Sequence, residues 1–294
     1  MTRIIKSLSD ISERYDVLYC DLWGCLHDGC RPFPEAVAAL RSFKARGGTV
    51  LLLTNSPRPR AQVEQQLQEI GVPRDCWDII ASSGDSARAA MLRGLVGHKV
   101  WFIGDAADHG FFAPMQIVGA APEITKVALE EAEGIVCTGP FDPRADPSVL
   151  RPQFLAAKAR GLKLLCANPD IIVDRGETRE WCAGALAALY TEMGGESLYF
   201  GKPHAPIYEL ARMRLAQIGI FPDPGRVLAV GDGIRTDILG ALGDGTDTLF
   251  ITGGLARTET GTGTGPAQQP DPDRLRAYLD EAQIEATYSI GYLR

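Results

Sequence analysis

Short apolar runs rich in β-branched residues alternate along this chain with segments of helical periodicity, and this alternation constrains the fold more than any other feature. Runs at 17–20, 49–55 and 78–82 are typical of buried strands. Helices are predicted between them at 34–44 and 56–71, where apolar residues recur every three or four positions. Such alternation indicates an α/β fold with a mainly parallel sheet, in which crossover helices connect the strands.

The alternation restarts after about residue 85 and continues to the end of the chain. Further strands are predicted at 99–105, 115–120, 134–139, 162–168, 226–232, 246–253 and within 287–293. Further helices are predicted at 147–161, 182–195, 205–219, 234–243 and 273–284, with a low-complexity loop at 258–272. A length of 294 residues indicates two domains, or one domain that carries a large insertion, at roughly 150 residues per domain.

Composition excludes several classes of function. A formal net charge of −7 gives the whole chain no attraction to nucleic acid or to anionic lipid, so neither is an expected partner. No run of about 18 apolar residues occurs, and the first 16 residues hold no apolar segment of signal-peptide length. The seven cysteines are an odd number without a Cys-x-x-Cys pair, which predicts buried free thiols and a reducing, cytoplasmic location.

Residues with chemical potential follow the predicted strands, where a parallel sheet places its ligand-binding loops. Asp21 follows the first strand, and Gly24 after it permits a close backbone approach to a ligand. Thr54, Asn55 and Ser56 follow the second strand and offer a hydroxyl, an amide and free N–H groups at a helix start. These groups suit a bound phosphate.

A second set of such residues lies in the last third of the chain. Lys202 precedes a helix in the sequence GKPH, and Asp232 and Asp237 surround a glycine-rich turn in VGDGIRTD. Together with Asp21 they give three carboxylates and one lysine, which predicts a site for a cation and a phosphate. Mg²⁺ is the expected cation because it prefers hard oxygen ligands.

Four segments resemble the motifs of the haloacid dehalogenase-like hydrolase superfamily, in the same order. They are DLWGCLHDG, LLLTNS, YFGKPHAPIYELA and VLAVGDGIRTDILGA. The separation of 148 positions from Thr54 to Lys202 resembles class IIA of that superfamily, in which a large α/β cap is inserted there. The resemblance implies a Rossmann-like core at 1–85 and 198–294 and an inserted cap domain at 86–197 that selects the substrate.

The resemblance also implies a role for each residue. Asp21 would attack phosphorus and form an aspartyl-phosphate, while Thr54, Asn55 and Lys202 bind the phosphoryl oxygens. Mg²⁺ would be bound by Asp21, the main-chain carbonyl of Trp23 and Asp232, with Asp237 in support. The segment CANPDIIVDRGE resembles a part of the cap near the substrate, which makes Asn168 and Asp170 candidate substrate-binding residues; both are also ordinary turn residues. The implied substrates are small phosphate monoesters. The resemblance also leaves a homodimer formed through the cap as an open alternative.

Trp23 departs from the family pattern, which has an aspartate two residues after the nucleophile as general acid and base. An indole performs neither task, and the loss of such catalysis costs roughly 10²- to 10⁴-fold in rate. Three hypotheses about the function follow: a phosphatase that favours good leaving groups, a phosphometabolite-binding regulatory protein, or a 2-haloacid dehalogenase. Clustered carboxylates favour metal-dependent phosphoryl chemistry over the last. His27 and Asp28 are candidate substitutes for the missing acid.

Overall fold

The computed structural model describes residues 2–113, 115, 123–175 and 178–294, and it divides into two compact units. Unit 1 comprises 1–54, 64–81 and 208–294, and unit 2 comprises 55–63 and 82–207. The two domains predicted from the sequence, 1–85 with 198–294 and 86–197, stay a prediction. The units differ from them chiefly in 55–63 and 198–207, which belong to unit 2.

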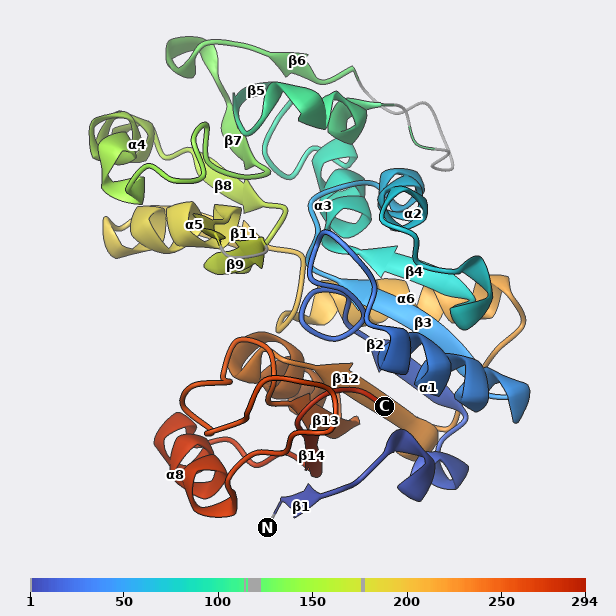
Figure 1. Ribbon diagram of the computed structural model, residues 1–294. Helices are drawn as coiled ribbons and strands as arrows, with labels where there is room; N and C mark the ends of the chain where they lie inside the picture. Colours follow the sequence, from blue (N-terminus) through green and yellow to red (C-terminus); the bar gives the residue numbers. More distant parts are fainter. Residues whose placement is uncertain (1, 114, 116–122, 176–177) are drawn as a thin grey trace. The chain divides into compact units, whose positions relative to one another are not determined.

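Unit 1 is built on a seven-stranded sheet with the strand order β1-β14-β13-β12-β2-β3-β4 (Figure 1). Each neighbouring pair from β1 to β3 is parallel. The strands are β1 (Arg3–Ile4), β2 (Val17–Cys20), β3 (Thr49–Thr54), β4 (Ile79–Ser82), β12 (Val227–Gly231), β13 (Asp247–Ile251) and β14 (Tyr288–Ile290). The residues of β2 and β12 are buried throughout, which explains their continuous apolar sequences.

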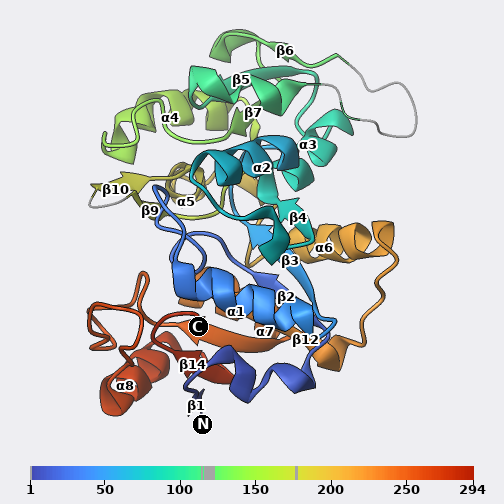
Figure 2. The ribbon, with the colours of Figure 1, turned by 45° about the vertical axis from the view of Figure 1, so that its right-hand side comes forward.

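Helices connect the strands of this sheet, and α1 shows how an apolar stripe packs a helix against it. In α1 (Pro34–Ala45), Pro34 occupies the first turn, and Val37, Leu40 and Phe43 are buried at helical spacing. The other helices are α7 (Leu239–Gly243) and α8 (Pro272–Ala282), together with α2 (Arg60–Glu69) and α6 (Ala205–Gln217), which contribute residues to both units. Figure 2 shows α1 lying along the sheet beside β2 and β3.

Unit 2 holds a five-stranded parallel sheet with the order β11-β8-β7-β5-β6 and an antiparallel hairpin of β9 and β10. Its strands are β5 (Lys99–Ile103), β6 (Thr125–Lys126), β7 (Gly134–Cys137), β8 (Lys163–Cys166), β9 (Ile172–Arg175), β10 (Thr178–Trp181) and β11 (Glu196–Tyr199). Its helices are α3 (Ser83–Leu92), α4 (Arg151–Ala159) and α5 (Ala183–Glu192). The apolar core of this unit includes Phe154, Leu186 and Tyr190.

The predicted parallel α/β fold is confirmed, and the differences lie in short or half-polar elements. The predicted strand at 115–120 falls almost wholly outside the described residues. The sequence patterns did not indicate helix α3, strand β11 or the hairpin of β9 and β10. The cysteines are free and buried as predicted, except Cys30, which lies exposed in a turn.

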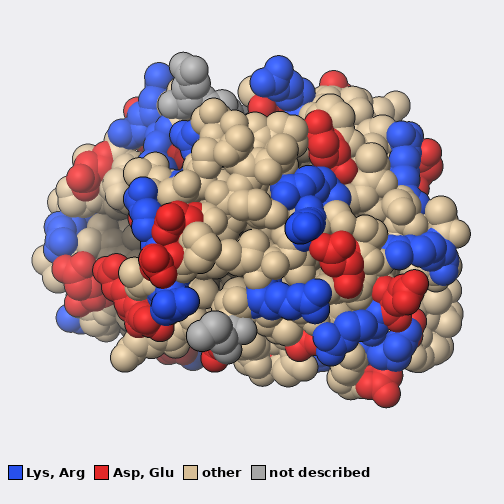
Figure 3. Space-filling view, turned by 60° about the horizontal axis from the view of Figure 1, so that its bottom comes forward, with Lys and Arg blue, Asp and Glu red and all other residues tan. Residues whose placement is uncertain are grey.

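Two further features concern the helices and the charged surface. Within the described parts of the chain, no helix is both long and apolar enough to cross a membrane. Acidic and basic side chains are interspersed over the face drawn in Figure 3.

Candidate functional site

Two carboxylates lie at the centre of the unit 1 sheet, where its strand order reverses. From β2 the chain continues to β3 and β4 on one side, and from β12 to β13 and β14 on the other. Asp21 follows β2 and Asp232 follows β12, which are neighbouring parallel strands. The N–H of Asp21 donates to the carbonyl of Val230 at 2.8 Å. Ligands of parallel α/β sheets bind at such a reversal, outside the carboxyl ends of the strands.

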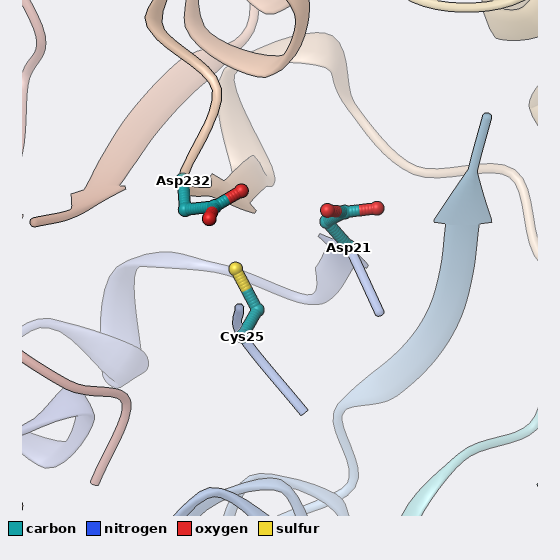
Figure 4. Close-up of side chains that lie close together, drawn as sticks. All are labelled: Asp21, Cys25 and Asp232. Carbon is teal, nitrogen blue, oxygen red and sulfur yellow. The ribbon is translucent and has the colours of Figure 1, made fainter. Parts of the chain in front are cut away.

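Asp21 and Asp232 form a compact cluster with Cys25, shown in Figure 4. One ligand atom from each of the three residues lies within 4.8 Å of the other two. All three side chains are buried, with exposed fractions of 8% for Asp21, 6% for Asp232 and 1% for Cys25. Two buried carboxylates at this distance repel each other, and a divalent cation between them removes the repulsion.

The backbone packs closely around the Asp232 carboxylate. A Cβ atom at Gly24 would lie 2.1 Å from Asp232 Oδ2, and one at Gly254 would lie 2.0 Å from it. Gly24 also has a φ of +72°, and the N–H of Leu255 donates to Oδ2 at 3.0 Å. The close backbone approach predicted at Gly24 is therefore made to Asp232. This cradle and the hard oxygen donors suit Mg²⁺.

Asp237 lies outside this cluster and holds the turn that carries Asp232. Its Oδ2 accepts the N–H of Gly233 at 3.1 Å and the hydroxyl of Thr236 at 3.4 Å. A Cβ at Gly231 would lie 2.1 Å from the carboxyl carbon of Asp237, so the side chain lies directly against the end of β12. Asp237 can thus support a cation site through the backbone next to Asp232.

The Trp23 indole packs within its own loop. Its ring lies edge-on to the His27 ring, with 5.3 Å between the centroids. Gly29, at a φ of +84°, lies so close that an added Cβ would come 2.2 Å from the indole. A glycine at 29 is therefore needed both for the left-handed backbone and for the space that the indole fills.

Neither candidate substitute for the missing acid is well placed for proton transfer. His27 is buried, its Nδ1 accepts the N–H of Gly29 at 3.0 Å, and burial lowers its pKa to about 4, with Asp28 opposing the shift. Asp28 is partly buried, which raises its pKa, but N–H groups of Cys30 and Arg31 and the Arg31 charge outweigh this and lower it. At neutral pH His27 is neutral and Asp28 is ionised, so neither holds a proton ready for a leaving group.

A second group of predicted residues lies in unit 2, around the side chain of Asn55. Asn55 Oδ1 accepts the N–H of Lys202 at 2.7 Å, and its Nδ2 donates to the carbonyl of Lys202 at 3.0 Å. The same Nδ2 donates to Asp170 Oδ1 at 2.7 Å. Asn55 thus fixes both backbone polar groups of Lys202, a buried lysine, and joins it to the Asn-Pro-Asp segment.

The remaining predicted residues have local contacts. Asn168 Oδ1 accepts the N–H of Asp170 at 3.0 Å, which is a turn interaction of the kind expected at an Asn-Pro-Asp sequence. Ser56 Oγ accepts the N–H of Arg58 at 3.3 Å. Thr54, the last residue of β3, is buried in unit 1.

Cys25 is the residue of the cluster that sequence reasoning missed. The sequence DLWGC places it in the loop after Asp21, but an odd number of cysteines without a Cys-x-x-Cys pair indicates core thiols and no ligand. The signal lay in Gly24, because a glycine with positive φ reverses the chain and returns the next side chain toward the strand end.

Comparison with known families agrees with this geometry. A model described as "Haloacid dehalogenase-like hydrolase" matches residues 18–117, and one described as "HAD-hyrolase-like" matches 199–282. Together these matches cover more than half of the chain. They include the segments that carry Asp21, Thr54, Lys202 and Asp232.

Individual relatives extend over nearly the whole chain. A haloacid dehalogenase-like hydrolase from Brucella suis 1330, known as a crystal structure, has 35% identity and a TM-score of 0.83, covering 99% of this chain and 100% of its own. The 5'-nucleotidase YutF of Bacillus subtilis is 26% identical over 84% of this chain and 91% of its own length. The ribonucleotide monophosphatase NagD of Escherichia coli is 25% identical over 81% and 87%.

Proposed function

Because this chain belongs to the haloacid dehalogenase-like hydrolases, and its class IIA relatives are phosphatases, we propose that it hydrolyses small phosphate monoesters through an aspartyl-phosphate on Asp21. One observation carries the proposal. Asp21 and Asp232 leave neighbouring central strands at the point of order reversal, and both carboxylates are buried within 4.8 Å of each other. A buried carboxylate beside a cation-binding partner is suited to nucleophilic attack on phosphorus.

The chain's own residues then divide the work of the first step. A carboxylate oxygen of Asp21 attacks phosphorus, and the alcohol oxygen of the substrate leaves with the bonding electron pair. We assign Thr54, the N–H groups that follow it and the ammonium of Lys202 to the phosphoryl oxygens. Asn55 makes two hydrogen bonds to the backbone of Lys202 and one to Asp170, and it is a positioning residue in this scheme.

We assign Asp21, Asp232 and the main-chain carbonyl of Trp23 to a bound Mg²⁺, with Asp237 holding the turn next to Asp232. When bound, the cation neutralises charge that develops on the phosphoryl group. A related glycerol phosphate phosphatase from Mycobacterium tuberculosis, of 24% identity, is known in complex with calcium. That complex supports a divalent cation for this chain as well.

Trp23 makes the leaving group the main determinant of the substrate. No acidic side chain stands two residues after Asp21, and His27 and Asp28 are engaged within their own turn. Aryl and acyl phosphates release weakly basic oxygens that need little protonation, so we propose them as the preferred substrates. The relatives include proteins named nitrophenyl phosphatases from Archaeoglobus fulgidus and Thermotoga maritima, which supports testing this class first.

The proposal is tested by measuring phosphate release from a panel of monoesters with Mg²⁺, using Asp21→Asn as the matched control. We expect release from aryl phosphates by the wild type and none above background by Asp21→Asn. Equal activity in the variant would remove Asp21 as nucleophile. If phosphorylated ligands raise the melting temperature without turnover, the protein is a phosphometabolite-binding regulatory protein and our proposal is wrong. Chloride release from 2-haloacids in the presence of EDTA would favour a dehalogenase.

The proposed setting is a cytoplasmic enzyme whose partner is a small phosphorylated metabolite rather than nucleic acid or membrane. A homodimer formed through residues 86–197 belongs to the same proposal. Sedimentation of the full chain, compared with a monomer of 294 residues, tests it.

A further inference from the structure

A sulfur atom shares the buried cluster of the two carboxylates. Cys25 has an exposed fraction of 1%, and its Sγ belongs to the set of ligand atoms within 4.8 Å that includes Asp21 and Asp232. Figure 4 shows the Cys25 side chain directed toward the Asp232 carboxylate. This donor set combines two hard oxygens with one soft sulfur, a combination that Mg²⁺ does not require.

The loop backbone fixes the thiol in this place. The carbonyl of Leu22 accepts the N–H groups of Leu26 at 2.8 Å and His27 at 3.1 Å, and the N–H of Gly24 donates to the carbonyl of His27 at 3.0 Å. These bonds close a tight turn just after the strand that ends at Cys20. The turn therefore fixes the backbone of Cys25 beside the end of the strand, and from there the short side chain is directed toward Asp232 (Figure 4).

We propose that Cys25 is a ligand for borderline and soft divalent cations at this site. Zn²⁺, Co²⁺ and Cd²⁺ are bound by Cys25 Sγ and by carboxylate oxygens of Asp21 and Asp232, whereas Mg²⁺ is bound through oxygen alone. The thiol proton passes to solvent as the bond between sulfur and metal forms. That this cluster binds a cation rests on the proposed function. The sulfur ligand from Cys25 goes beyond that function.

Metal selectivity follows from this donor set. Thiolate ligands raise the affinity for zinc and its neighbours far more than for magnesium. We therefore expect Zn²⁺ to displace Mg²⁺ and inhibit phosphate release in the wild type. In Cys25→Ser the affinity for Cd²⁺ should fall by at least about 10-fold, the lower end of the losses typical of residues that only support a metal ligand.

The experiment is a Co²⁺ titration of the full chain, freed of other divalent cations and followed by absorption. Sulfur bound to Co²⁺ gives a charge-transfer band in the near ultraviolet that oxygen ligands do not give. We expect a band that saturates at one Co²⁺ per chain in the wild type and is lost in Cys25→Ser. Cys30→Ser removes the exposed thiol and Cys76→Ser another buried thiol of unit 1, and both should keep the band.

A band that persists in Cys25→Ser, or stoichiometric Co²⁺ binding without a band in the wild type, overturns the inference. If Cys25→Ser does not fold, Cys25→Ala replaces it. X-ray absorption of the Zn²⁺-loaded wild type gives an independent test, in which a sulfur atom at about 2.3 Å from zinc supports the inference and its absence overturns it. Phosphate release with Mg²⁺ is measured on the same preparations. A Cys25-dependent band without Asp21-dependent release refutes only the proposed function, whereas release without a band refutes only the sulfur ligand.

Discussion

Trp23→Asp should give the protein the general acid that its loop lacks. Because the family resemblance places its general acid two residues after the nucleophile, we expect a carboxyl group at position 23 to reach the leaving oxygen. Trp23→Asn is the matched control, because asparagine has the same shape and removes the same indole but transfers no proton at neutral pH.

The expected gain depends on the leaving group. General acid catalysis contributes about 10²- to 10⁴-fold in rate, which corresponds to about 2.7–5.4 kcal/mol of barrier at 1.36 kcal/mol per factor of ten. We expect a gain in this range for an alkyl phosphate and a gain below about tenfold for nitrophenyl phosphate. Both substitutions lose the contacts of the indole with Gly29 and His27, so both should be destabilised by about 1–3 kcal/mol.

The assay measures kcat and KM for glycerol phosphate and nitrophenyl phosphate in the wild type and both variants. Thermal unfolding of the two variants checks that their stabilities match. If Trp23→Asp and Trp23→Asn show equal rates on the alkyl substrate, or if the wild type already hydrolyses both substrates equally well, the reasoning about Trp23 is wrong.

Three further predictions test the groups around the site. Asn55→Ala removes two buried hydrogen bonds to Lys202 and a part-buried one to Asp170, which should cost about 3 kcal/mol of unfolding free energy. It should also lower kcat/KM through displacement of Lys202, whereas Gln65→Ala at an exposed position should change neither quantity. An unchanged kcat/KM in Asn55→Ala would contradict a positioning role. Burial lowers the pKa of His27 from 6.5 to about 4, so as the pH falls the unfolded chain takes up a proton on this histidine before the folded chain does. About 3 kcal/mol of stability present above pH 6.5 should therefore be lost as the pH falls toward 4. His27→Asn should flatten this part of the curve of melting temperature against pH, and a slope identical to that of the wild type would refute the prediction. EDTA should stop phosphate release and Mg²⁺ should restore it. Mg²⁺ at about 100 times its Kd should stabilise the wild type by about 2.7 kcal/mol and leave the stability of Asp232→Asn unchanged. An equal stabilisation of that variant would place the cation elsewhere.

The central strands could be predicted from the sequence because burial on both faces makes them continuously apolar. Val17–Cys20 and Val227–Gly231 carry this pattern, and both run directly into an aspartate. A parallel sheet brings such strand ends to one edge, so the sequence places Asp21 and Asp232 at the same edge. The structure adds that their two strands are direct neighbours. The family comparisons support the same reading of these segments.

Features that depend on a few backbone angles could not be predicted in this way. The hairpin of Ile172–Arg175 with Thr178–Trp181 has no strong alternation, and helix Ser83–Leu92 has small and polar residues on its buried side. Tertiary packing decides such elements rather than local pattern. The direction of the Cys25 side chain likewise depends on the positive φ of Gly24, which the sequence permits without requiring.

The loop after Asp21 is adapted to the indole of Trp23. This packing bears on why an indole stands where related phosphatases have an acidic residue. Gly29 has the one side chain that leaves room for the Trp23 ring, and its N–H is satisfied by His27, whose own ring meets the indole edge. A carboxylate at position 23 would need none of these accommodations. Because both Gly29 and His27 lie against the indole, Trp23 is part of the packing of this loop. That packing fits our proposal that the preferred substrates have leaving groups that depart without a donated proton.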